Sequence, residues 1–390
     1  MLALRLARGS HPLVLLRRLS VAVAAAGTGF LLLSTVGHAA GHPSAADESL
    51  VRLLWCAAPL AATAQFAVST ARTDPAARLQ RGMAAAGLGP LRLTLLATAS
   101  TALTCLLGVL LALLAFLRLR GDLGGPGSSG SLGIDSALLG AGHPVPLAGA
   151  LLLLATVPVT AAIATAVALR PRNENGSRET AARPRTAPPS GLPWGIALAA
   201  AGLAIEAYTS PGPHAPGGLL PLPGRLIGSP PGVLAGWALS AFGLVLAGPG
   251  LVHLCGRMLC AGRPGALRLL SGRVLQEESH RLGRPLGVLC AVGSAAYAAV
   301  KVYEASPARP FGPLTAVGAA VVLACVTASA LTAALESRTA RAHTTAALRR
   351  LGASASVLHR AAALRGLALV LVLAPLTWTV AEMATLPLVH

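Results

Sequence analysis

The sequence predicts an all-α integral membrane protein that crosses the bilayer about nine times. Of its 390 residues, 54% are hydrophobic and 11% are charged, and the mean hydropathy is +0.68. Soluble globular chains carry far more charge, so this composition excludes an ordinary soluble domain. The apolar residues run in stretches of roughly 18 to 25, close to the roughly 20 that a helix needs to cross the hydrocarbon. Because lipid offers the backbone no hydrogen bonds, these stretches are expected to be helices.

Taken in order, the apolar stretches give nine predicted spans, within a range of eight to ten. They cover residues 19–37, 51–70, 91–116, 146–169, 192–209, 232–255, 285–303, 314–335 and 366–387. Four arginines precede the first span: Arg5, Arg8, Arg17 and Arg18. Basic residues stay on the cytoplasmic side of a membrane, so the N-terminus is predicted to be cytoplasmic. An odd number of spans then places the C-terminus outside.

The first span has a second interpretation as a cleaved signal peptide. Gly37 and Ala39 are small residues that could flank a cleavage site. The apolar stretch is longer than that of a usual signal peptide, so a retained helix is expected.

The net charge of +18 is interpreted as a signal of topology. The basic residues lie between apolar stretches, and only 3% of the chain is aromatic, so no nucleic-acid partner is expected. With a cytoplasmic N-terminus, six of the 31 Lys and Arg residues face outward and 25 face the cytoplasm. Most of these 25 lie near the N-terminus and in residues 71–90, 170–193, 257–284 and 336–365.

An internal repeat organises the chain. Residues 3–6 read ALRL and recur as ALRL at 266–269, and Gly9 and Arg18 recur at the same offset as Gly272 and Arg281. Each copy precedes a span, a short outer loop, a second span, a basic cytoplasmic loop and a third span. The copies enter from the same side, so the repeats are parallel. The predicted divisions are 1–169 for the first repeat, 170–191 for an Arg- and Pro-rich linker, 192–255 for a linker pair of spans, and 256–390 for the second repeat.

The two basic cytoplasmic loops also correspond to each other. Residues 77–87 and 342–352 each read as a basic helix that ends in a glycine, Gly87 or Gly352. Glycine suits the end of a helix because it adopts a left-handed backbone conformation without steric cost.

This layout, together with the run from Leu348 to Ser354 (LRRLGAS), resembles the FtsX-like (MacB-type) permeases of ABC transporters. The first copy, from Ala84 to Pro90, is degenerate. The resemblance implies a bacterial plasma-membrane subunit, paired with itself or with a related permease, that exports a hydrophobic or amphipathic compound. It also implies a separate cytoplasmic ATPase, which would bind the ATP and contact the helix between the second and third spans of each repeat. The candidate coupling residues are Arg78, Arg81, Gly87, Arg349, Arg350 and Gly352.

Two departures from the family keep other functions open. The second repeat has three spans where a fourth is expected, so it is interpreted as truncated, and the outer loops 41–50 and 304–313 are too short to fold as domains. The alternatives are a membrane scaffold or signalling subunit that transports nothing, and a secondary carrier. The arginines themselves could instead only set topology or bind anionic lipid headgroups, at about 1 kcal/mol each.

No residue is assigned to catalysis, to a cofactor or to a metal, and the chain is not expected to be an enzyme. The phosphate-binding pattern GxxxxGK[ST] is absent from the sequence. The six cysteines are interpreted as buried thiols. Ionisable residues within spans are suspected of function. Here Glu206, Lys301 and Glu382, with Arg52, fall toward the outer ends of spans, where side chains are expected to reach the interface.

Overall fold

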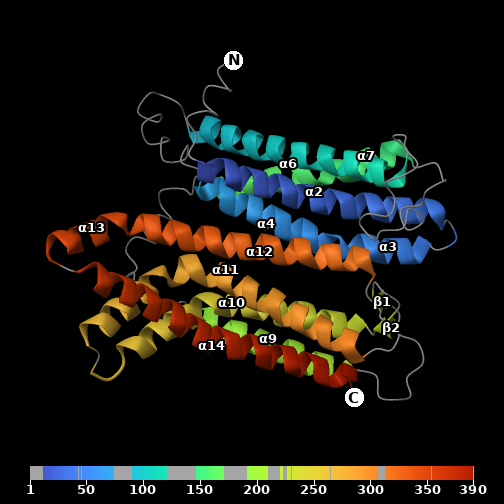
Figure 1. The fold of residues 1–390 in the computed structure, drawn as a ribbon. Helices are drawn as coiled ribbons and strands as arrows, with labels where there is room; N and C mark the ends of the chain where they lie inside the picture. The colour runs from blue at the N-terminus through green and yellow to red at the C-terminus, as the bar shows by residue number, and fades with distance from the viewer. Residues whose placement is uncertain are drawn as a thin grey trace. The chain divides into compact units, whose positions relative to one another are not determined.

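The computed structural model describes residues 12–42, 44, 46–73, 90–121, 146–170, 191–209, 220–222, 226–229, 231–263, 265–305, 312–352 and 354–389. Its elements in chain order are α2 (Pro12–Gly41), α3 (Ala46–Trp55), α4 (Ala57–Thr73), α6 (Pro90–Arg120), α7 (Leu147–Leu169), α9 (Gly191–Thr209), β1 (Leu220–Leu222), β2 (Leu226–Ser229), α10 (Pro231–Cys260), α11 (Ala266–Ala305), α12 (Pro313–Ala340), α13 (Ala342–Arg350) and α14 (Ala355–Val389) (Figure 1).

Nine helical segments of the described chain are long and apolar enough to span a membrane, and each overlaps one predicted span. The helical, multi-pass membrane class is therefore confirmed. Among the described residues, the short antiparallel strands β1 and β2 depart from the all-α prediction.

Three spans differ in detail from the prediction. The second is broken at Cys56, where α3 ends and α4 begins. Pro59 has no backbone N–H to continue the hydrogen bonding of α3 through this point. Helices α11 and α14 begin well before their predicted spans, at Ala266 and Ala355. The polar residues ahead of these spans therefore continue the same helices.

The chain forms two compact units. Unit 1 comprises Met1–Pro171 and Phe311–Ser329, and unit 2 comprises Arg172–Pro310 and Ala330–His390. Helix α12 thus contributes its first part to unit 1 and its last part to unit 2. The predicted linker pair, α9 and α10, belongs to unit 2, and the predicted boundary at 255/256 falls within α10.

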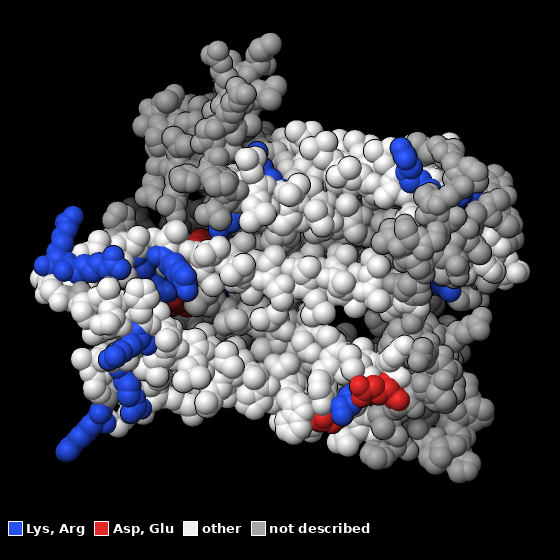
Figure 2. All heavy atoms as spheres, viewed as in Figure 1, with Lys and Arg blue, Asp and Glu red and all other residues white. Residues whose placement is uncertain are grey.

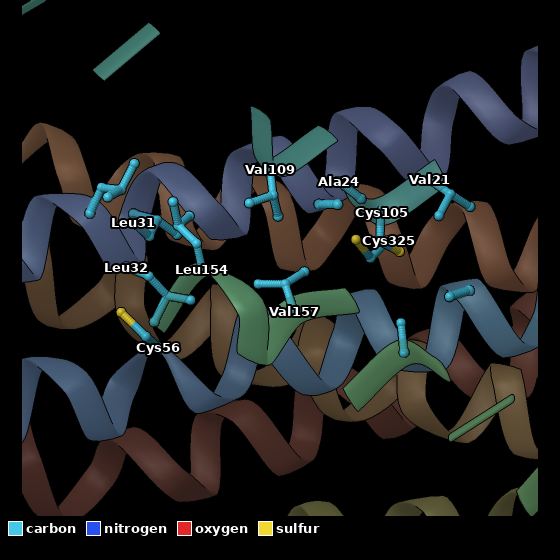
Figure 3. Packing of buried hydrophobic residues seen from close by; sticks show 14 of the residues in the cluster. Val21, Ala24, Leu31, Leu32, Cys56, Cys105, Val109, Leu154, Val157 and Cys325 are labelled. Carbon is cyan, nitrogen blue, oxygen red and sulfur yellow. The ribbon is translucent and has the colours of Figure 1, made fainter. Parts of the chain in front are cut away.

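Unit 1 is built around α2, which contacts α3, α4, α6 and α7. Its core consists mainly of aliphatic side chains, among them Val21, Leu31, Val109 and Val157 (Figure 3), and also includes Phe66 and Phe116. A polar contact lies within this core. The hydroxyls of Thr28 in α2 and Thr63 in α4 are 2.8 Å apart, and the Thr63 hydroxyl is 3.8 Å from the Cys325 sulfur in α12. Such hydroxyl contacts hold helices together in lipid, where apolar burial contributes little.

Unit 2 is built around α10, which packs between α9 and α11, while α11 also packs on α14. Glycines make the contact between α9 and α10 very close. A Cβ added at Gly195, Gly202 or Gly243 would lie within 3 Å of atoms of the opposite helix. Small residues of this kind let two helix backbones approach and gain dispersion contacts.

Candidate functional site

The short helix α13 carries the predicted coupling residues of the second repeat. It joins α12 to α14, and Arg349 and Arg350 lie exposed in its last turn. Positive charges there are favourable because the C-terminal end of a helix carries partial negative charge. The Gly352 backbone N–H donates to the Arg349 carbonyl at 3.0 Å, and the φ of Gly352 is +93°. The left-handed helix end predicted at Gly352 is thus observed.

Alanine in place of Gly352 is expected to strain the turn from α13 to α14. The strain would come from the backbone alone, because no described atom lies within 4 Å of an added Cβ. A left-handed alanine costs about 1–2 kcal/mol. The matched control is Gly366→Ala in α14, where the Cβ also meets no described atom and where alanine favours the helix by about 1 kcal/mol. Thermal unfolding in detergent should show a lower melting temperature for G352A and an equal or higher one for G366A. Equal melting temperatures for G352A and the wild type would contradict this role for Gly352.

Leu351 is a feature of this turn that sequence reasoning missed. Leu351 follows Arg350 and precedes Gly352 in the sequence, and its side chain is 83% exposed. A large apolar side chain that is this exposed beside two arginines offers a partner both an apolar and a charged contact. The available signal was the Leu-Gly pair itself, since a residue beside a helix-ending glycine lies outside the packed helix.

An ion pair fixes the start of α13 to α11. The Arg341 Nε lies 2.7 Å from Glu278 Oε1, and most of both side chains is buried. The same guanidinium donates to the Ser337 carbonyl at 3.0 Å and to the Ser337 hydroxyl at 3.1 Å. Burial lowers the pKa of the Arg341 guanidinium, and the Glu278 carboxylate opposes that shift. Sequence reasoning did not pair these residues, because they lie in different cytoplasmic segments.

Exposed arginines surround α13 at the same end of unit 2. Figure 2 shows basic side chains gathered where α13 lies, with others toward the turn from α10 to α11. We call this surface the basic end of unit 2. The exposed arginines of the segments that lead to this surface, 257–284 and 338–360, are Arg257, Arg263, Arg268, Arg273, Arg281, Arg284, Arg338, Arg349, Arg350 and Arg360. All lie in segments that were predicted to face the cytoplasm.

The coupling residues predicted in the first repeat, Arg78, Arg81 and Gly87, lie outside the described residues. Their assignment stays a prediction from the sequence.

The Glu206 side chain is buried against α10, contrary to the sequence prediction that it reaches the interface. It is 1% exposed, and its Oε1 accepts a hydrogen bond from the Trp237 indole N–H in α10. Its Oε2 has no hydrogen-bond partner among the described residues. The cause is the glycine contact of α9 with α10, since Gly236 packs directly against Glu206. The prediction failed because it considered the depth of Glu206 along α9 and not the face on which it lies.

Lys301 and Glu382, which were also predicted to reach the interface, both lie beside the Tyr297 side chain. The Tyr297 hydroxyl in α11 donates to Glu382 Oε1 in α14 at 2.8 Å, and the Trp378 indole N–H donates to the Tyr297 oxygen at 3.3 Å. Lys301 is exposed, with its Nζ 5.7 Å from the centre of the Tyr297 ring. These contacts join α11 to α14 at the end of the unit opposite α13.

Within the part of the chain that the structure describes, no group of three or more His, Cys, Asp or Glu side chains could hold a metal ion. The six cysteines are free thiols, and all except Cys260 are buried.

Comparisons of the chain with protein-family models, with curated proteins and with solved structures found no match.

Proposed function

We propose that this chain is the membrane-spanning permease subunit of an ABC transporter, driven by a separate cytoplasmic ATPase. In this proposal it pairs with itself or with a related permease in the plasma membrane of a bacterium, and it exports a hydrophobic or amphipathic compound. The direction and the substrate class rest on the sequence resemblance. The observation that carries the proposal is α13, a short basic helix with exposed Arg349, Arg350 and Leu351 that is tied at its start to α11.

The packing within each unit supports the two-repeat layout behind this proposal. In unit 1, the first helix of the predicted repeat, α2, packs on the third, α6. In unit 2, the first helix of the second predicted repeat, α11, packs on the third, α14. The first and third helices are therefore partners in both predicted repeats, as expected if the repeats share one architecture.

The chemistry of α13 suits a protein partner with acidic groups around an apolar depression. Two adjacent guanidinium groups can each form charge-assisted hydrogen bonds with carboxylates. Leu351 extends beyond them and can enter an apolar pocket, where a central buried side chain contributes most to binding. Anionic lipid headgroups would also satisfy the arginines, and Leu351 adds an apolar contact that a protein pocket can receive.

The test is co-purification in detergent with the ATPase encoded nearest to this gene, together with the rate of ATP hydrolysis. The double variant Arg349→Glu and Arg350→Glu should weaken the association at least about tenfold, because like charges then face each other across the interface. The matched control, Arg257→Glu and Arg263→Glu, makes the same charge change elsewhere on the basic end and should retain most of the association. Equal loss in both variants would indicate general electrostatic attraction and would contradict a docking role for α13.

Glu206 favours a second candidate function, an ion- or proton-coupled carrier. A carboxyl group buried between two spans is costly and is a common element of ion pathways. A carrier would need no ATPase, so failure of the wild-type chain to bind or alter any ATPase would favour this candidate.

A further inference from the structure

Helix α11 extends well beyond its apolar part. At 40 residues it is about twice as long as a helix needs to be to cross the hydrocarbon. Its charged residues are concentrated in the first part, Ala266–Arg284, which we call the lead-in of α11. The apolar part begins at Pro285. The lead-in therefore continues out of the predicted span as one helix toward the basic end of unit 2.

The lead-in is bonded to three neighbouring segments of unit 2. The Ser271 hydroxyl donates to the Ala361 carbonyl of α14 at 3.2 Å, and the Gln276 side-chain amide lies 3.8 Å from the Cys260 sulfur of α10. The Glu278 carboxylate pairs with Arg341, immediately before α13. Arg341 is also bound to Ser337 of α12 and directly precedes α13, so its guanidinium has little freedom, and a displacement of the start of α13 acts on Glu278.

The lead-in meets the span at a contact that is suited to bending. A Cβ added at Gly283 would lie within 3 Å of Pro249 and Gly248 of α10, and one added at Gly287 would lie as close to the Leu244 carbonyl. Pro285 in α11 and Pro249 in α10 each lack the N–H that would continue the hydrogen bonding of its helix. Bends in helices occur at such proline and glycine positions. Both helices therefore lack a backbone hydrogen bond close to the point where they contact each other.

We propose that the Glu278–Arg341 ion pair is the joint that transmits movement of α13 to the lead-in of α11, which pivots at Gly283–Pro285 against α10. The inference rests on the proposed function, because the ATPase is what would move α13. Glu278 and Arg341 are positioning residues that contact neither nucleotide nor substrate. The pivot would change the packing of α10 and α11, the two central helices of unit 2.

The experiment is hydrogen exchange followed by mass spectrometry, first on the chain alone. Glu278→Gln should increase exchange of the α13 amides about tenfold or more, the factor expected when one charge-assisted hydrogen bond is lost. The control is Glu277→Gln, which removes the neighbouring, exposed carboxylate and should leave exchange in α13 unchanged. The exchanged pair, Glu278→Arg with Arg341→Glu, should restore most of the protection. Unchanged exchange in E278Q would overturn the joint, whatever the ATPase does.

The second stage uses the complex with the ATPase, with and without ATP. In the wild type, ATP should change exchange both in α13 and around Gly283–Gly287, and E277Q should behave in the same way. In E278Q the change in α13 should remain, while the change around Gly283–Gly287 is lost. A retained response at both places would overturn the transmission. Absence of any ATPase-dependent change at α13 in the wild type would instead refute the proposed function, so the two failures are distinguishable.

Discussion

Leucine in place of Gly202 is expected to separate α9 from α10 and to destabilise unit 2. A Cβ at Gly202 would lie within 3 Å of the Gly236 carbonyl and of the Ser240 backbone nitrogen and hydroxyl. Two of these three atoms are backbone, so α10 itself would have to move. Overpacking a close contact typically costs about 1–3 kcal/mol. Helices that move apart in lipid also lose neighbouring dispersion contacts, which are the main source of their association.

The G202L effect is measured as the melting temperature and the monodisperse yield in detergent. The control is Gly149→Leu in α7, where an added Cβ approaches only the Pro146 ring, at 3.9 and 4.0 Å. G202L should lose most of its monodisperse yield, and G149L should stay close to the wild type. Similar behaviour of the two variants would mean that the glycines of α9 are not needed for its contact with α10.

The number and position of the spans could be predicted because each depends on one local property, the length of an apolar stretch. The same property misplaced the starts of α11 and α14, since hydropathy marks only the part of a helix that lies in lipid. Backbone hydrogen bonding continues through residues such as Arg268 and Arg360, which are good helix formers. The glycines of the α9–α10 contact were present in the sequence, but with 43 glycines in the chain their role could not be recognised without the fold.

The candidate site shows the same division between local and tertiary information. Gly352 was predictable because ending a helix is a local property of the backbone, and Arg349 and Arg350 precede it directly. The pairing of Glu278 with Arg341 was not, because it depends on how α11 packs near the junction of α12 and α13. The burial of Glu206 likewise depends on which face of α9 meets α10. Sequence reasoning thus located the surface of the site and missed the contacts behind it.

Phenylalanine in place of Trp237 is expected to destabilise the α9–α10 pair through Glu206. The change retains an aromatic ring but removes the indole N–H that donates to Glu206 Oε1. Because Glu206 is buried and its Oε2 has no partner among the described residues, the carboxyl group would lose the donor that offsets its burial. Leaving a buried polar group without its partner costs about 1–3 kcal/mol, and more for a charged one.

The decisive comparison is between W237F and the double variant that also carries Glu206→Leu. Replacing both members of a buried polar pair by apolar groups is often neutral, so the double variant should recover at least about 1 kcal/mol relative to W237F. The control is Trp378→Phe, because the Trp378 side chain is exposed and its indole donates over 3.3 Å. Denaturant-induced unfolding in detergent should rank W378F close to the wild type, the double variant next and W237F lowest. If the double variant were instead less stable than W237F, Glu206 would be stabilising α9 against α10 by contacts other than the one with Trp237.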